Sequence, residues 1–115
     1  MPMLTSSYIG VFNIMPRGII LHTADNVATL IDPARDGQTC TLQGEVAGQV
    51  IARQDIAFGH KICIAPIPLG ANVLKYGQVI GRATRAIAAG EHAHVHNVDS
   101  ARARGDRQER QEVRP

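Results

Sequence analysis

The sequence has very few large aromatic side chains. Its 115 residues include two Phe, two Tyr and no Trp, so a core must be assembled from Val, Ile, Leu and Ala. A chain of this length can bury one modest core, but not a core together with a deep active site enclosed by its own walls. We therefore expect one domain whose chemistry depends on a second chain.

Long apolar segments are also absent. No stretch reaches the run of about 18 apolar residues that a membrane-spanning helix requires, and no basic segment followed by an apolar one opens the chain. We expect a cytoplasmic protein with no membrane partner. Cysteine is scarce, and without an export signal Cys40 and Cys63 are expected to be buried thiols with no catalytic role.

Most of the chain has no excess of positive or negative charge. Residues 1–99 carry seven basic and seven acidic side chains, whereas residues 100–115 carry five Arg against three acidic residues. Nucleic-acid binding needs Lys and Arg clustered on a folded face, so we expect no nucleic-acid partner. Residues 100–115 contain a single Val among polar side chains, which predicts a charged, disordered tail.

Short runs rich in Val and Ile fill the segment 18–99. Runs such as 18–21, 27–31 and 49–51 are separated by Gly, Pro and Asp. No uninterrupted window carries an apolar stripe with helical spacing over three turns. This pattern predicts a compact all-β domain with short helical turns.

An internal repeat links three of the turns. The pattern Ile-x-x-Gly-x-x-apolar occurs at residues 56–62, 67–73 and 87–93, with unequal spacing between the copies. In each copy the Ile is expected to anchor a turn in the core, and the Gly to adopt a backbone conformation that other residues avoid. We therefore predict that the three glycines occupy equivalent turn positions. Because the spacing is unequal, the copies are expected to be similar turns within one fold and not the repeats of a solenoid. The three glycines are Gly59, Gly70 and Gly90.

Three histidines alternate in the segment 90–97. In an extended strand His92, His94 and His96 would place their imidazoles on one face, where two neighbours could bind one Zn, Fe or Mn ion. We favour His94 and His96, because His92 and His96 would lie about 13 Å apart along such a strand. An exposed strand without a metal is the alternative, since no acidic residue on the same face completes the ligand set.

Further candidates flank two turns. His60 and Lys61 follow Gly59, and in a strand they would point to opposite faces, so that only one of them lines a given pocket. The tripeptide alone has little specificity. For His22 a structural setting is expected, such as turn capping by the nearby Asp25. Residues 75–77 predict a strand followed by a tight turn, with Tyr76 packed half-buried.

In their joint order these motifs resemble the SAF domain of the altronate/galactarate dehydratase family, which also includes the small subunit of sulfolactate sulfo-lyase. The resemblance covers roughly residues 18–98 and implies a β-clip fold for residues 18–99. It does not account for residues 1–17, which form an N-terminal extension. The matching motifs are Asp25-Asn-Val27, Gly59-His-Lys61, Ile67-x-x-Gly70, Lys75-Tyr-Gly77, Ile80-Gly81 and Gly90-Glu-His-Ala-His-Val-His-Asn97.

The resemblance implies a small subunit of a metal-dependent hydro-lyase or sulfo-lyase. Its substrate would be a sugar acid or a related 2-hydroxy acid, with or without a sulfonate group. The small subunit would be inactive without a larger subunit. A divalent metal is expected, with iron first and manganese or zinc as alternatives. The metal would stabilise an enediolate while a base removes the proton beside the carboxylate.

The family motifs assign roles to five positions of this chain. His60, Lys61 and His96 are expected to be catalytic, Lys61 and Asn97 to bind substrate, and His94 and His96 to ligate the metal. The alternative is a non-enzymatic SAF-type binding or assembly module, which has no need for both the Gly-His-Lys and the His-x-His-Asn motif. A homo-oligomer is compatible with either interpretation.

Overall fold

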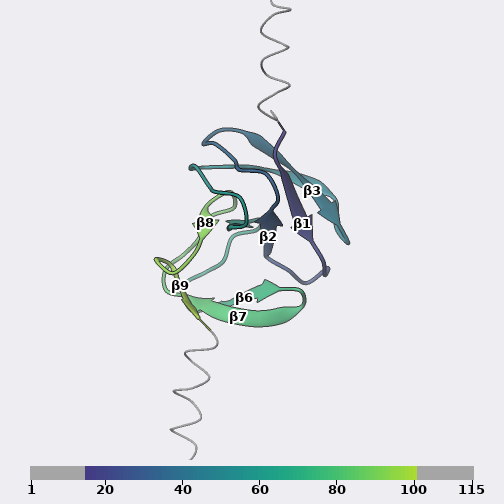
Figure 1. Ribbon diagram of the computed structural model, residues 1–115. Helices are drawn as coiled ribbons and strands as arrows, with labels where there is room; N and C mark the ends of the chain where they lie inside the picture. Colours follow the sequence, from purple (N-terminus) through teal and green to yellow (C-terminus); the bar gives the residue numbers. More distant parts are fainter. Residues whose placement is uncertain (1–14, 101–115) are drawn as a thin grey trace, which may run out of the picture.

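Residues 15–100 are described by the computed structural model, and they form nine strands and no helix (Figure 1). The all-β prediction is confirmed, although the expected short helical turns are tight turns instead. The predicted extension up to residue 14 and the predicted tail from residue 101 lie outside the described residues. The strands are β1 (Arg17–Ile20), β2 (Val27–Leu30), β3 (Thr39–Gly44), β4 (Gly48–Ile51), β5 (Lys61–Cys63), β6 (Asn72–Lys75), β7 (Gln78–Ala83), β8 (His92–Ala93) and β9 (Val98–Ser100).

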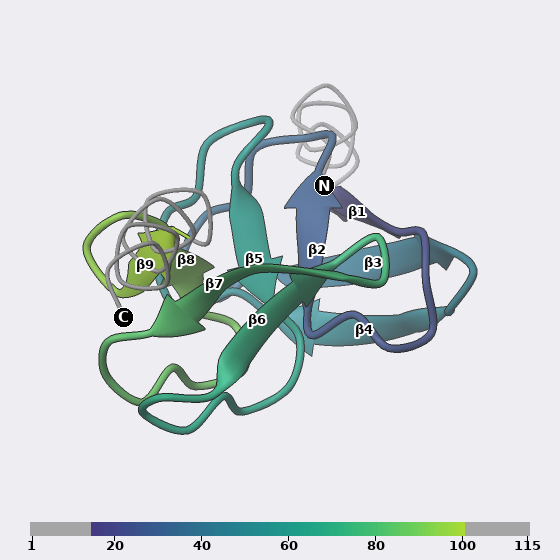
Figure 2. The same ribbon diagram turned by 90° about the horizontal axis from the view of Figure 1, so that it is seen from below.

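The strands form two sheets. Six of them make a curled sheet in the order β4-β3-β1-β2-β5-β8, and three make a small sheet in the order β6-β7-β9. Only β1 and β3 pair in parallel among these neighbours. Seen from below, β6 and β7 cross in front of β2 and β5 (Figure 2). Within residues 15–100 no helix is long and apolar enough to cross a membrane.

Two apolar clusters lie on opposite faces of the central strands. Ala28 and Leu30 of β2 belong to the first cluster, whereas Val27 of the same strand belongs to the second. On β5, Ile62 and Cys63 divide in the same way. Because side chains alternate along a strand, β2 and β5 contribute to both cores at once. Small aliphatic side chains thus suffice, as the scarcity of aromatic residues requires.

The predicted equivalence of the repeat glycines is confirmed. Gly59, Gly70 and Gly90 all have positive φ, at 83°, 85° and 94°. Each donates its backbone N–H to the carbonyl of a buried residue, at 2.7 or 2.8 Å. The following residue accepts a hydrogen bond from that same buried residue, so the three settings match. The buried partners are Leu30, Ala83 and Cys63.

A fourth copy was missed in the sequence. Gly37 has a φ of 91° and donates to the carbonyl of Ala52 in the same way. Its anchor is Ala34, which forms an antiparallel bridge with Ile56, just as Ile67 bridges Ile87. The four turns therefore form two pairs, one in each core. The copy escaped the pattern search because Ala stands where the other three have Ile.

Asp25 and Asn26 fasten the small sheet to the large one. The Asp25 carboxylate, 8% exposed, accepts hydrogen bonds from the N–H groups of Tyr76 (2.9 Å) and Gly77 (2.8 Å). The Asn26 Oδ1 accepts from the N–H of Leu74 at 2.7 Å. The structural role expected for His22 is confirmed, since its Nδ1 accepts the Ala24 N–H at 3.0 Å. The prediction that Asp25 caps this local turn is wrong, because its carboxylate caps the distant β6–β7 hairpin.

Two smaller predictions have different outcomes. Cys40 and Cys63 are buried and unpaired, as expected. Tyr76, expected to be half-buried in packing, lies in the hairpin turn with a φ of 56° and is exposed at the surface. Tyr76 belongs to neither apolar cluster, and the Lys75 ammonium group lies over its ring.

Candidate metal centre and adjacent pocket

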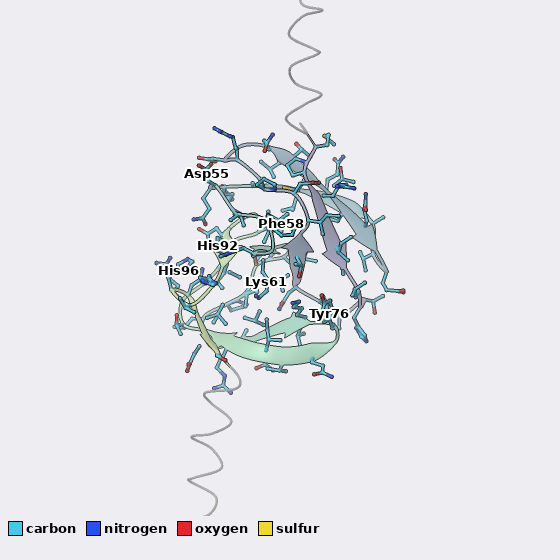
Figure 3. All side chains as sticks on the ribbon, in the orientation of Figure 1. Asp55, Phe58, Lys61, Tyr76, His92 and His96 are labelled. Atoms are coloured by element: carbon cyan, nitrogen blue, oxygen red, sulfur yellow. The ribbon has the colours of Figure 1, made fainter. Side chains whose placement is uncertain are left out.

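The register of β5 and β8 brings three histidines together. Ile62 pairs with His92, and Lys61 with Ala93, so His60 lies beside the β8 segment on the same face as His92. The ring nitrogens of His60, His92 and His94 lie within 4.8 Å of one another. We call these three side chains the histidine cluster. Figure 3 shows His92 and His96 on the same side of the molecule, where Figure 1 labels β8 and β9.

The prediction of an extended strand through His96 is wrong. Strand β8 ends at Ala93, and the carbonyl of His94 accepts hydrogen bonds from the N–H groups of Asn97 (3.0 Å) and Val98 (2.8 Å). This turn folds the chain back, so the rings of His92 and His96 are 5.5 Å apart instead of far along a strand. Of the expected pair of ligands, His94 is in the cluster and His96 adjoins it.

Asn97 holds the turn that carries the histidines. Asn97 is buried, with 2% of its surface exposed. Its Oδ1 accepts a hydrogen bond from the His94 N–H at 2.9 Å. Its Nδ2 donates to the His92 carbonyl, also at 2.9 Å. The buried amide thus positions the backbone of its own loop, and the expected substrate contact of Asn97 stays a prediction.

A pocket of about 310 Å³ adjoins the histidine cluster. Lys61 and Lys75 line it together with apolar side chains of the small sheet, and His94 is part of its wall. His60 does not line it, which confirms that His60 and Lys61 serve opposite faces of β5. His94 thus belongs both to the cluster and to the lysine-lined pocket. Sequence reasoning missed Lys75 as a pocket residue.

Comparison with known proteins identifies the family of the domain. Residues 16–101 match the family described as the altronate/galactarate dehydratase SAF domain. The chain belongs to this family. The SAF domain is 43% identical over 79 residues to altronate dehydratase of Escherichia coli (strain K12), a match that covers 69% of this chain and 15% of that enzyme.

A second relative is similar over nearly its whole length. The (2R)-sulfolactate sulfo-lyase subunit alpha of Chromohalobacter salexigens is 32% identical over 88 residues, which cover 72% of this chain and 94% of that subunit. Galactarate dehydratase (L-threo-forming) of E. coli is 33% identical over 72 residues, or 13% of its length. The SAF domain therefore corresponds to a small part of the dehydratases and to almost all of the sulfo-lyase subunit.

The surroundings of His92 and His94 favour the neutral form of both side chains. Burial, followed by the charges of His60, His94 and His96, lowers the pKa of His92 to about 4. The pKa of His94 is lowered by the same kinds of effect, burial first. A neutral imidazole is the form that ligates a metal ion. At neutral pH these side chains can therefore bind a cation without first releasing a proton.

The cluster geometry suits a single ion. His60 Nδ1 and His92 Nε2 are 2.9 Å apart. Two neighbouring nitrogens bound at about 2.0–2.2 Å to one ion lie about 3.0–3.6 Å from each other, so this pair needs little movement. The three nitrogens together span up to 4.8 Å, so the cluster would have to contract around an ion. Three nitrogen ligands leave coordination positions for water or substrate. Without an ion, the same two nitrogens form a hydrogen bond whose direction depends on the tautomers.

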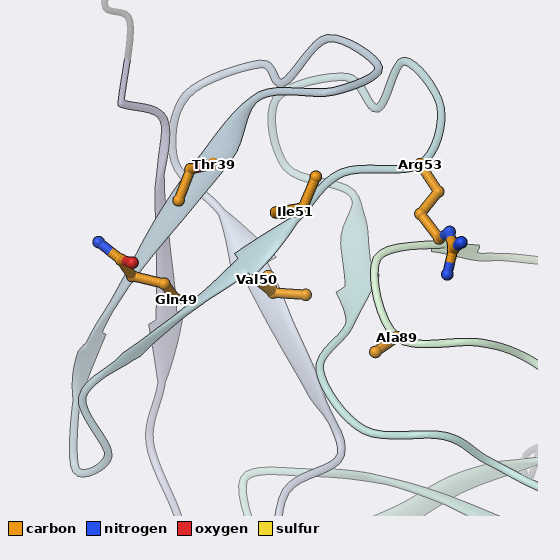
Figure 4. Close-up of a pocket in the computed structure, with 6 residues that line it drawn as sticks. All are labelled: Thr39, Gln49, Val50, Ile51, Arg53 and Ala89. Carbon is orange, nitrogen blue, oxygen red and sulfur yellow. The ribbon is translucent and has the colours of Figure 1, made fainter.

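A larger pocket lies elsewhere. It measures about 560 Å³ and is formed by the β3–β4 edge and the turn before Gly90 (Figure 4). Arg53 is the one charged side chain in its wall, and no histidine or carboxylate lines it. This composition offers neither a metal ligand nor an acid–base pair, so we place the chemistry at the histidine cluster.

Proposed function

We propose that this chain is the SAF-type subunit of a metal-dependent lyase, which eliminates water or sulfite from a sugar acid or a related 2-hydroxy acid. The observation that carries the proposal is that His94 joins a three-histidine cluster to a lysine-lined pocket. Membership of a family named for two dehydratases supports an elimination reaction. The similarity to a sulfo-lyase subunit widens the substrate class to sulfonated acids.

His60, His92 and His94 would hold the ion, with iron as the first expectation and manganese or zinc as alternatives. When bound, a divalent ion supplies Lewis-acid stabilisation of negative charge on the substrate oxygens. Lys61 binds the substrate carboxylate in the adjacent pocket and orients it toward His94. His96, exposed beside His92, is placed to accept or return a proton at its imidazole nitrogen.

A larger subunit completes the site in this proposal. The SAF domain corresponds to 15% of the length of altronate dehydratase, so a second chain would supply most of the substrate pocket. Phe58, before His60, and Val95, beside His94, expose 66% and 79% of their surface. Large apolar side chains next to a functional site are typical of a surface that a partner covers.

Metal removal and restoration test the proposed function. The complex of this chain with its larger subunit would be treated with a chelator and then supplied with Fe²⁺, Mn²⁺ or Zn²⁺ under anaerobic conditions. We expect turnover of a sugar acid or sulfonated 2-hydroxy acid to disappear and return with the ion. Replacing His92 and His94 with Gln should abolish the recovery, whereas the matched variant His22→Gln should retain it. Full turnover by the metal-free complex would contradict the proposal.

A further inference from the structure

The whole sequence contains only two lysines, and both line the same pocket. Lys61 comes from β5 of the large sheet and Lys75 from the end of β6 in the small sheet. The other ten basic residues are all Arg. Figure 3 shows Lys61 between the large sheet and the small one, with Tyr76 at the hairpin turn that follows Lys75. Each sheet thus contributes one lysine to the same pocket.

Neither lysine has a carboxylate partner among residues 15–100. No ion pair joins Lys61 or Lys75 to an acidic side chain there, and both are partly buried. The wall around them is largely apolar, with Val73, Ile80 and Val98. Two uncompensated like charges beside apolar walls repel each other, and an anion between them removes that repulsion.

The fold also fixes where the Lys75 ammonium group lies. Its Nζ is 4.6 Å from the centre of the Tyr76 ring, a cation–π contact that leaves the ammonium hydrogens free to donate. The Tyr76 backbone has a φ of 56°, and the buried Asp25 carboxylate accepts its N–H. The Asp25 hydrogen bond therefore fixes the backbone of the turn and with it the Tyr76 ring, against which the Lys75 ammonium group packs.

We propose that Lys61 and Lys75 form a two-lysine subsite for an oxyanion of the substrate, a carboxylate or a sulfonate, next to His94. Lys75 then gains a binding role, although the family motif in which it stands, Lys75-Tyr-Gly77, gave it none. The proposal rests on the proposed function, because His94 is what connects the subsite to the metal centre. Each lysine offers a compact positive charge with three donors that can turn toward an oxyanion.

The scarcity of lysine makes a direct test practical. Reductive methylation of the full chain with ¹³C-formaldehyde labels Lys61, Lys75 and the α-amino group and keeps their positive charge. We expect malonate or methanesulfonate to shift both lysine signals in a saturable manner, while glycerol at equal concentration does not. A preference for malonate would indicate a carboxylate in the subsite, and a preference for methanesulfonate a sulfonate.

Matched variants separate this subsite from general electrostatics. Lys75→Met keeps most of the side-chain stem and should weaken the preferred anion about tenfold. Arg35→Gln removes a charge from a distant exposed turn and should leave the affinity unchanged. Lysine signals that move no more than with glycerol would overturn the proposal, and so would unchanged affinity in Lys75→Met.

The same measurements distinguish failure of the subsite from failure of the proposed function. If the complex needs metal for turnover but malonate and methanesulfonate leave both lysines unaffected, the subsite is wrong and the lyase proposal stands. If an anion binds between the lysines while the metal-free complex turns over fully, the subsite stands and the metal proposal is wrong.

Discussion

At the scale of single residues, His94 and Asn97 decide how the site is built. His94 is shared by the histidine cluster and the pocket, and Asn97 holds its backbone in place. A motif can reveal that such residues occur together, but not that one of them belongs to the histidine cluster and the other is a buried support. That division follows from burial and from the direction of hydrogen bonds.

The pKa of His92 predicts a pH dependence of folding in the absence of metal. Because the folded-state pKa is about 4 and the ordinary value is 6.5, the unfolded chain binds more protons between these pH values. The free energy of unfolding should therefore fall as the pH is lowered from about 6.5 toward 4. Urea unfolding at several pH values measures it. His92→Gln should flatten the dependence and His22→Gln should not, and a profile unchanged in His92→Gln would contradict the assignment.

Replacing Asn97 with Ala should destabilise the histidine turn. The variant leaves the His94 N–H and the His92 carbonyl without their side-chain partner, at a cost of about 1–3 kcal/mol in the free energy of unfolding. The matched variant Asn72→Ala changes an exposed side chain and should stay within about 0.5 kcal/mol. Chemical denaturation compares the two. Equal stability of both variants would refute the positioning role of Asn97.

At the scale of elements, four glycine turns hold the strands in two cores, but their glycines differ in surroundings. A Cβ on Gly70 would meet nothing within 4 Å, whereas on Gly90 it would lie 2.1 Å from the Ile51 carbonyl oxygen. Gly70→Ala should therefore cost about 1 kcal/mol, from the positive φ alone.

Gly90→Ala should cost clearly more than Gly70→Ala, because the backbone beside it must move as well. Thermal unfolding of the two variants checks the difference. Because Gly90 lies in the turn before the histidine cluster, Gly90→Ala should also weaken the proposed metal binding. If both variants were destabilised equally, the close approach at Gly90 would have no energetic consequence.

The same elements show how far sequence reasoning reached. Alternation and breakers predicted the strands around 18–21, 27–31 and 49–51, and positive φ at the repeat glycines, because these features depend on neighbouring residues. The pairing of β5 with β8, which brings His60 to His92, depends on contacts 32 residues apart. The turn after Ala93 was missed because its hydrogen bonds include the side chain of Asn97, which a period of two does not reveal.

At the scale of the whole molecule, the domain carries part of a site on its surface. The histidine cluster and the lysine pocket open beside the exposed Phe58 and Val95, and the chain is small compared with the dehydratases in its family. Under the proposed function, the domain would bind the ion and one end of the substrate, while a larger chain would enclose the rest. We therefore expect no turnover by this chain alone.

Turnover by the reconstituted complex tests the central claim most directly. The double variant His92→Gln, His94→Gln should assemble with the larger subunit as the unaltered chain does, and should lower kcat by about a hundredfold or more. The His22→Gln complex serves as the matched control and should keep its kcat. Unimpaired turnover by the double variant in the complex, or robust turnover by the small chain alone, would contradict the account.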